Sequence, residues 1–212
     1  MSAGGTAIAS APTSQRVPVA AHAATASHRH HGGAGGPSCY RQLDNDNGIA
    51  VVSQNFEVAY DIYDSRAADD FTLTKRCRIG KVAVNGTYYL GVGPVDSVHV
   101  TIYKDNDRRI GGIVSTQNKL RYTDPTDTGN LKVTLAKPVN LAPGRYWISV
   151  KANMHFSLAG QWEWNTNNRA VGEKSKWANP NDGFGTGCTR YRDTVKCLPI
   201  GEGPDFSFAL LR

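Results

Sequence analysis

The chain has 212 residues, of which 40% are hydrophobic and 20% charged, and 24 bases against 18 acids give a formal net charge of +6. This length predicts one domain with an appendage, and no apolar run approaches the ~18–20 residues of a membrane-spanning helix, so no transmembrane segment is expected. The bases are scattered between acids rather than gathered in one stretch, so a nucleic-acid partner is not expected.

The first 37 residues, here called the leader, consist almost entirely of Ala, Gly, Ser, Thr, Pro and His. Such a segment cannot bury enough apolar surface to offset the entropy of ordering it. We therefore predict a disordered tail or linker over residues 1–37 and an ordered domain over residues 38–212. The leader also lacks the apolar core of a secretory signal.

Four histidines of the leader are potential metal ligands, namely His22, His28, His30 and His31. Imidazoles on a flexible chain can bind zinc or nickel without forming a dedicated site. We favour the simpler interpretation of a histidine-containing linker.

Residues 44–48 (DNDNG) alternate oxygen ligands and end in glycine, like the first half of a calcium loop. An EF-hand is excluded because Gln54 stands where the pattern requires a bidentate acid. A structural calcium ion held by Asp44 and Asp46 would need distant acids as further ligands, and the candidates are Asp69, Asp70 and Asp205. The alternative is an Asp/Asn-rich surface turn without an ion.

Beyond residue 49, apolar residues recur two positions apart in short segments separated by turn signals such as Asn85-Gly86. A period of two places these side chains on one face of a strand. Residues 64–70 allow one helical turn at most. The pattern predicts an all-β fold, an antiparallel β-sandwich or jelly roll. The apolar pairs are Val82/Val84, Val98/Val100/Ile102, Val133/Leu135, Tyr146/Ile148/Val150 and Phe206/Phe208/Leu210.

Large aromatic residues gather in an Asn-rich part of the chain. Trp162 and Trp164 are two apart and would share one face of a strand, and Trp177 and Tyr191 follow. Exposed rings beside Asn and Asp side chains suit stacking on sugars, so these four residues predict a site for a glycan or another surface ligand. The alternative is that the rings fill the sandwich core, where large aromatics supply much of the buried area.

Signatures of catalysis are weak in this sequence. It contains no Gly-x-Ser-x-Gly elbow, no His-Glu-x-x-His and no phosphate-binding glycine loop. Glu163 suggests one carboxylate of a glycosidase, but the sequence nominates no second carboxylate. His155 near Ser157 lacks a third, orienting group. We therefore expect a protein without catalytic activity.

Four cysteines allow three pairings, and the sequence alone does not choose among them. Cys188 and Cys197 enclose a short polar loop, which a disulfide would stabilise by about 2.5–3 kcal/mol in the chain-entropy model. Cys39 and Cys77 would then staple the start of the domain. An even count in a loop-rich β-domain favours an oxidising compartment, whereas the alternative zinc site lacks a Cys-x-x-Cys pair.

Five short runs are spread over most of residues 40–212: YRQLDNDNG (40–48), AADDF (67–71), GRYWISV (144–150), GQWEW (160–164) and GFGTGC (183–188). In these runs the chain resembles an uncharacterised β-sandwich domain of bacterial secreted and cell-surface proteins. The resemblance implies secretion, a β-sandwich fold and an accessory role beside proteases or other surface proteins. It supplies no catalytic residues, and the chain departs from it at Cys77, where a turn residue is expected.

The sequence thus predicts a secreted or cell-surface, non-catalytic β-sandwich that binds a glycan or surface ligand through its aromatic cluster, with calcium as a structural cofactor. The alternatives are a structural or partner-binding scaffold whose aromatics are core and, less favoured, a hydrolase.

Overall fold

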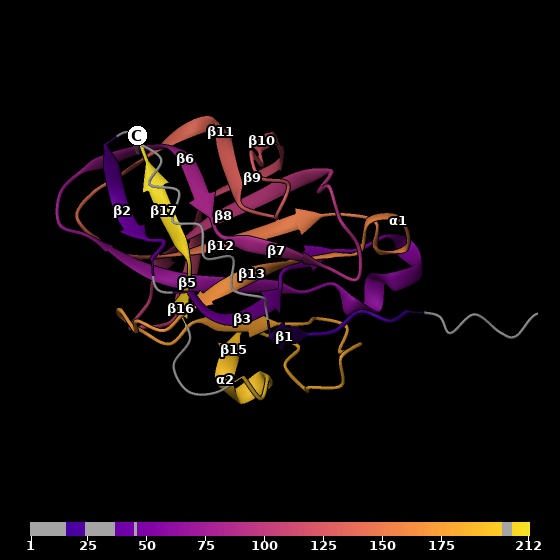
Figure 1. Cartoon of the computed structure of the whole chain (residues 1–212). Coiled ribbons are helices and arrows are strands. Elements are labelled where there is room, and N and C mark those ends of the chain that lie inside the picture. Colours follow the sequence, from indigo (N-terminus) through magenta and orange to yellow (C-terminus); the bar gives the residue numbers. More distant parts are fainter. Residues whose placement is uncertain (1–15, 24–36, 45, 201–204) are drawn as a thin grey trace, which may run out of the picture.

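The computed structural model describes residues 16–23, 37–44, 46–200 and 205–212. Over these residues the chain forms three β-sheets and three short helical segments (Figure 1). The helical segments are η1 (Val58–Tyr63), α1 (Phe156–Ala159) and α2 (Thr194–Cys197). No helix in the described ranges is long and apolar enough to cross a membrane.

Each sheet follows one hydrogen-bonded order. The first sheet contains β1 (Ala21–Ala23), β3 (Asp46–Val52), β13 (Gln161–Asn167) and β16 (Asp205–Phe206), with β7 (Gly86–Tyr89) also paired to β13. The second contains β10 (Tyr122–Thr123), β11 (Leu131–Leu141), β6 (Cys77–Val84), β17 (Phe208–Leu211) and β2 (Ser38–Gln42). The third contains β15 (Arg192–Asp193), β14 (Lys176–Ala178), β5 (Arg66–Leu73), β12 (Gly144–Asn153), β8 (Ser97–Asp105) and β9 (Ile110–Leu120), with β4 (Gln54–Asn55) paired to β12.

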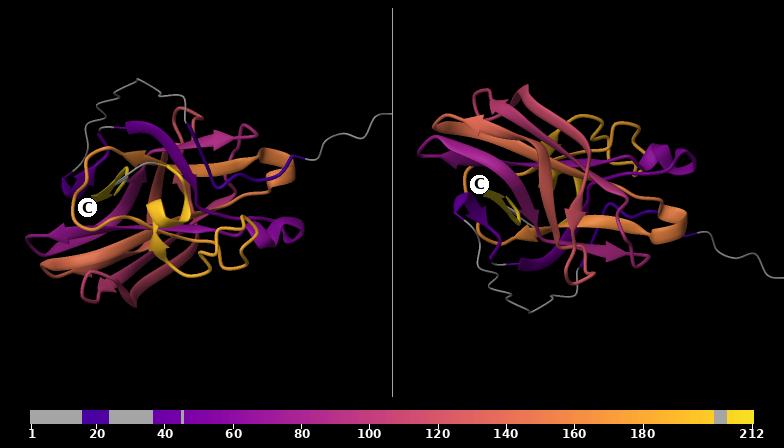
Figure 2. Two further views of the ribbon diagram at one scale, coloured as in Figure 1. Left: turned by 90° about the horizontal axis from the view of Figure 1, so that it is seen from below. Right: turned by 90° about the horizontal axis from the view of Figure 1, so that it is seen from above.

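The first two sheets form one layer because two chain segments run from one sheet into the other. The strand β6 continues into β7 through Asn85, and β16 continues into β17 through Ser207. Backbone hydrogen bonds cross the junction, from Asn85 N–H to Ser207 O (3.1 Å) and from Ser207 N–H to Asn165 O (2.9 Å). The third sheet faces this layer across the core, as the two views of Figure 2 show. All strand pairs are antiparallel except β4 with β12, and the prediction of an all-β antiparallel sandwich is confirmed.

The predicted period-two segments lie in β6, β8, β11, β12 and the β16–β17 pair. Their apolar side chains are buried in the shared core, apart from Tyr146, which is partly exposed. The periodicity of these segments therefore located the strands correctly.

At two places the structure differs in detail from what the sequence pattern allowed. Asn85-Gly86 is not a hairpin turn but the junction between two sheets, where a Cβ on Gly86 would lie 2.5 Å from Trp162 Nε1. Glycine is needed there because the indole packs directly against the backbone. The helical turn falls at η1, upstream of residues 64–70, and Arg66–Leu73 forms β5, whose pairing with both β12 and β14 favours an extended chain.

Part of the leader also departs from the prediction of a disordered tail. Residues 21–23 form β1, which pairs antiparallel with β3. Short-range sequence composition could not show this, because the partner groups lie on β3 and β13, up to 142 residues away. The remaining histidines of the leader, His28, His30 and His31, lie outside the described residues.

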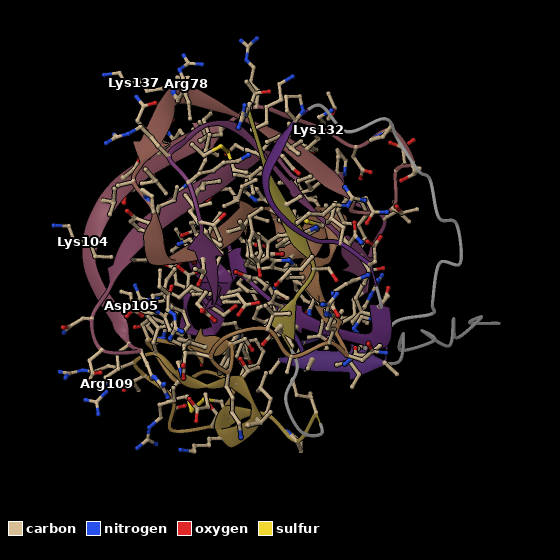
Figure 3. All side chains as sticks on the ribbon, turned by 90° about the vertical axis from the view of Figure 1, so that its left-hand side faces the viewer. Arg78, Lys104, Asp105, Arg109, Lys132 and Lys137 are labelled. Atoms are coloured by element: carbon tan, nitrogen blue, oxygen red, sulfur yellow. A yellow bond between two sulfur atoms is a disulfide. The ribbon has the colours of Figure 1, made fainter. Side chains whose placement is uncertain are left out.

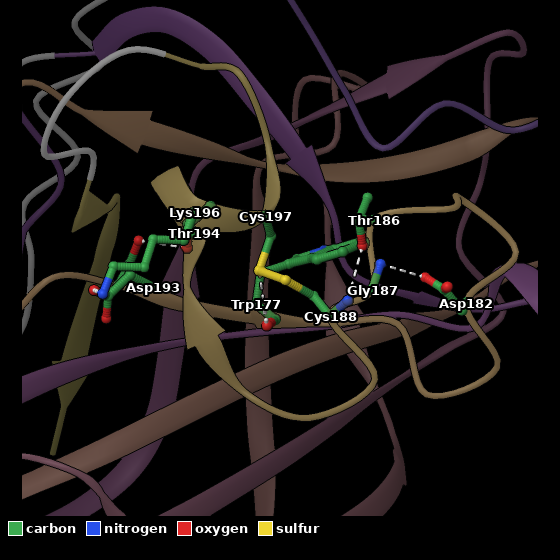
Figure 4. Close-up of a disulfide and its surroundings, with 10 residues drawn as sticks. Trp177, Asp182, Thr186, Gly187, Cys188, Asp193, Thr194, Lys196 and Cys197 are labelled. Atoms are coloured by element: carbon green, nitrogen blue, oxygen red, sulfur yellow. Dashed lines mark hydrogen bonds and ion pairs between the residues drawn. A yellow bond between two sulfur atoms is a disulfide. The ribbon is translucent and has the colours of Figure 1, made fainter.

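Both disulfides pair as the loop argument suggested. Cys39–Cys77 joins β2 to the start of β6, and Cys188–Cys197 closes a nine-residue separation ending in α2 (Figure 4). All four cysteines are used, which overturns the alternative of a zinc site. The Cys197 sulfur lies 3.9 Å from the Trp177 carbonyl oxygen, so the second disulfide packs on β14.

Candidate functional site

The three tryptophans of the predicted aromatic site lie in the core. Trp162, Trp164 and Trp177 are each 0% exposed. Each indole N–H donates to a backbone carbonyl, on Gly129, Ser207 and Val52 respectively, at 2.9 Å. Buried and satisfied in this way, the rings supply core area and not a surface for sugar stacking.

Tyr191 lies against the third sheet, next to Arg192, whose strand partner is Trp177. Its hydroxyl donates to Ser149 Oγ at 3.1 Å, and the Arg66 guanidinium lies 4.8 Å from the ring centroid. The structure therefore does not bring the four predicted aromatic residues together as one exposed platform.

The five acids predicted to share calcium divide between surface and interior. The Asp44 and Asp46 side chains are exposed, and Asp46 accepts hydrogen bonds from Gly48 N–H (2.8 Å) and Asn165 Nδ2 (3.1 Å). The other three, Asp69, Asp70 and Asp205, are buried. Among the described residues no group of three or more His, Cys, Asp or Glu side chains is placed to hold a metal ion.

Asp69 and Asp205 form a buried acidic pair where β5 meets β16. Asp69 Oδ2 accepts from Gln42 Nε2 (2.8 Å) and Phe206 N–H (2.7 Å), while Asp205 Oδ2 accepts from Val171 N–H (2.5 Å). Burial, with the neighbouring acid, raises the pKa of Asp69 well above its ordinary range, and burial raises the pKa of Asp205 to about 7. This pair is held by amide donors of the domain itself.

Glu163 is a second buried acid, and the leader supplies one of its partners. Its Oε2 is paired with His22 Nδ1, and its Oε1 accepts from Gln161 Nε2. Burial raises the pKa of Glu163 to about 7, and the bond and charge of His22 act in the opposite direction. The bonded partners of Glu163 are thus an imidazole and an amide, not the second carboxylate that a glycosidase needs.

A recess of about 450 Å³ opens at the end of the sandwich where β4, β8 and β12 meet η1 and α1. Its volume lies within the ~300–1,000 Å³ typical of small-molecule sites. Buried Phe56 and Met154 provide apolar surface, and polar side chains provide the rest. The polar lining residues are Asn55, Glu57, Asp96, Ser97, His99, Lys119, Asn153 and His155.

One amide organises the polar side of this recess. Asn153 Nδ2 donates to Ser97 Oγ at 2.8 Å and lies 2.6 Å from His99 Nε2. Burial, followed by the charges of Lys151 and Lys119, lowers the pKa of His99, which favours the neutral imidazole that can accept this bond. His99 Nδ1–H, the Ser97 hydroxyl proton and Asn153 Oδ1 are then left as a fixed set of two donors and one acceptor.

His155 and Ser157 do not form a catalytic pair. His155 is exposed and precedes α1, whose first amides, on Phe156 and Ser157, donate to the Glu57 carboxylate at 2.7 and 2.9 Å. Glu57 thereby fixes α1 at the rim of the recess.

Exposed basic side chains are spread over the other end of the sandwich, on β6, β11 and the β8–β9 hairpin, where Asp105 lies between two of them (Figure 3). They are exposed, and none forms an ion pair with another described residue. The residues are Arg78, Lys104, Arg109, Lys132 and Lys137.

The recess was missed from the sequence because its residues come from four separate strand ends, and Asn153, His99 and Ser97 match no motif. The alternation of Ser97 and His99 along β8 was the available signal, since a period of two places both on one face.

Comparisons with protein-family models, with curated proteins and with solved structures found no match to this chain.

Proposed function

We propose that this protein is a secreted, non-catalytic binding module whose recess takes a neutral, hydroxyl-rich ligand such as the terminal unit of a glycan. The observation that carries the proposal is the Asn153 amide bridging Ser97 and His99 within the recess. It holds donors and an acceptor in fixed positions, as a sugar-binding site requires. Two disulfides support an oxidising, extracellular compartment.

The mixed charge of the lining favours a neutral ligand. Asp96 opposes Lys119, and the Glu57 carboxylate accepts the first two amides of α1, so the recess has no dominant charge of one sign. Phe56 and Met154 form the apolar floor of the recess, and their near-complete burial leaves recognition of the ligand to the polar side chains around them.

Titration of the ¹⁵N-labelled full chain with maltose, cellobiose, chitobiose and mannobiose tests this proposal. We expect saturable shifts of the amides of Ser97, His99 and Asn153 with at least one disaccharide, and at least tenfold weaker binding by Asn153→Ala. The matched control is Asn140→Ala, because Asn140 is an exposed asparagine of β11 outside the recess. Absence of saturable shifts with all four sugars, or equal binding by both variants, would contradict the proposal.

A second candidate function rests on the basic residues of Figure 3, which suit an anionic cell-surface polymer. We expect the full chain to bind an immobilised sulfated polysaccharide and to elute with increasing salt. Arg78→Glu with Lys137→Glu should elute at lower salt, whereas Lys119→Glu, at the recess, should elute closer to the unmodified chain. Equal elution of both variants would count against this function.

A further inference from the structure

The strand β1 lies in a groove formed by residues far from it in the sequence. The groove consists of the free edge of β3, Tyr89 of β7, and Gln161 and Glu163 of β13, and is here called the leader groove. Figure 1 shows β1 lying beside β3 at the margin of the first sheet.

The backbone of the leader is bound as an added strand. His22 lies opposite Ala50 in an antiparallel register, and Val52 N–H donates to Ala20 O at 3.0 Å. The Gln161 side chain bonds both backbone groups of Val19: Val19 N–H donates to Oε1 (2.9 Å), and Nε2 donates to Val19 O (2.7 Å). Main-chain bonding of this kind is how domains bind extended peptides at a sheet edge.

One side chain of the leader, that of His22, is bound by specific residues of the leader groove. The His22 ring stacks on Tyr89 with centroids 3.8 Å apart and planes 20° apart, and its Nδ1 meets Glu163. The His22 side chain is 16% exposed and the Glu163 side chain 0%. Because the Glu163 carboxyl is fully buried, removing the ring would leave its Oε2 without this hydrogen-bond partner, so the groove favours an imidazole at this position.

The rest of the leader makes few demands. The residues flanking His22 are alanines, and Val17 is 56% exposed. The two disulfides tie residues from Cys39 onward and leave β1 without a covalent tie other than its own chain. Recognition thus rests on Val19, His22 and the strand backbone between them, with two further contacts: Pro18 is buried, and Arg16 Nη1 donates to Leu90 O at 2.8 Å.

We propose that the leader groove is a peptide-binding site and that residues 17–23 of this chain occupy it as a replaceable ligand. The ligand class is an extended peptide with a histidine three residues after the position read by Gln161. This inference concerns a different face of the molecule from the sugar recess and does not depend on it.

Cleavage within the intact chain tests replaceability. A protease site is placed within residues 24–36, the full-length protein is cut after folding, and a fluorescent peptide of residues 16–23 is added in excess. We expect the peptide to displace the native fragment and to bind the cut protein. A peptide with His22→Ala should bind at least tenfold more weakly, because it loses a hydrogen bond to a charged group. The control peptide with Val17→Ala should bind within about twofold of the unmodified one, since Val17 is more than half exposed.

Two further readouts make the test decisive. The double variant Gln161→Ala, Glu163→Gln is cut in the same way, and its fold is checked by circular dichroism. We expect it to release the cut leader fragment. The inference is overturned if the folded, cut protein binds no peptide, if the fragment resists displacement by excess peptide, or if the histidine and alanine peptides bind equally. An uncut chain that forms dimers lost in His22→Ala would overturn the assignment of the occupant as the chain's own leader.

Discussion

Glu163 and Asp69 are both completely buried carboxyl groups with raised pKa values, yet their partners come from different parts of the chain. Asp69 is held by Gln42 and by the backbone of Phe206, and the Cys39–Cys77 disulfide ties the strand carrying Gln42 to β6. Glu163 is held partly by His22, on a strand without such a tie. One buried acid therefore belongs to the core of the domain, and the other lies at the contact between the domain and the leader.

The largest loss in the free energy of unfolding should come from removing the Cys39–Cys77 disulfide near Asp69. Replacing Cys39 and Cys77 by alanine releases a 38-residue separation, which the chain-entropy model values at about 4 kcal/mol. Denaturant unfolding of the double variant measures this. If the Asp69 and Glu163 sites are independent, the β1–β3 contact should persist in the folded fraction of this variant. Loss of that contact would show that the two sites depend on each other.

Asp69→Ala should lower the free energy of unfolding by about 3 kcal/mol, because Gln42 Nε2 and Phe206 N–H would lose their acceptor at about 1–3 kcal/mol each. Asp69→Asn keeps an acceptor oxygen and is the matched control, with an expected loss below ~1 kcal/mol. Equal losses in the two variants would place the importance of Asp69 in its charge instead of its hydrogen bonds.

His22→Ala should cost about 2 kcal/mol at pH 8, because it leaves the buried Glu163 carboxylate without the hydrogen-bond partner at its Oε2. Adding Glu163→Gln should recover part of that loss, since the neutral amide needs no counter-charge. A double-mutant cycle by chemical denaturation measures the coupling. Strictly additive losses would show that His22 and Glu163 do not interact.

Stability should also decline gradually with rising pH. Burial raises the pKa of Asp205 to about 7 and that of Asp70 to about 6, so the folded protein holds these protons more tightly than the unfolded chain. Their contribution is complete below about pH 4 and is lost as the pH rises through about 6–7. His99, with a lowered pKa, acts in the opposite direction, so the difference between unmodified protein and Asp205→Asn isolates the acid.

We expect the Tm of the unmodified chain to fall more steeply between pH 5 and pH 8 than that of Asp205→Asn. Parallel curves for the two proteins would contradict the raised pKa of Asp205.

The strands of the domain were predicted well from the sequence, because the burial of every second residue is a local signal. Val98, Val100 and Ile102 show it directly, and all three are buried in β8. Disulfide pairing followed from loop length once an oxidising compartment was assumed. The strands depend on residues close together in the chain, and four cysteines can form only three sets of disulfide pairs.

Function was harder to predict because β13 is buried on both faces. Trp162 and Trp164 alternate with Gln161 and Glu163, and all seven residues of β13 are buried. Gln161 and Glu163 are bonded by Val19 and His22, which the low-complexity composition of the leader had assigned to disorder. Residues that meet across some 140 positions leave no local pattern. In the recess, Ser97 and His99 alternate along one strand, but Asn153 joins them from 56 positions away.

Amide hydrogen exchange in His22→Ala, followed by NMR, tests most directly whether the Glu163 site is an interface and the Asp69 site is core. The account predicts faster exchange of Val19 N–H and Val52 N–H, which bond across the leader groove, and unchanged exchange of Phe206 N–H, which bonds Asp69. Equal acceleration at all three amides, or none at Val19 and Val52, would contradict it.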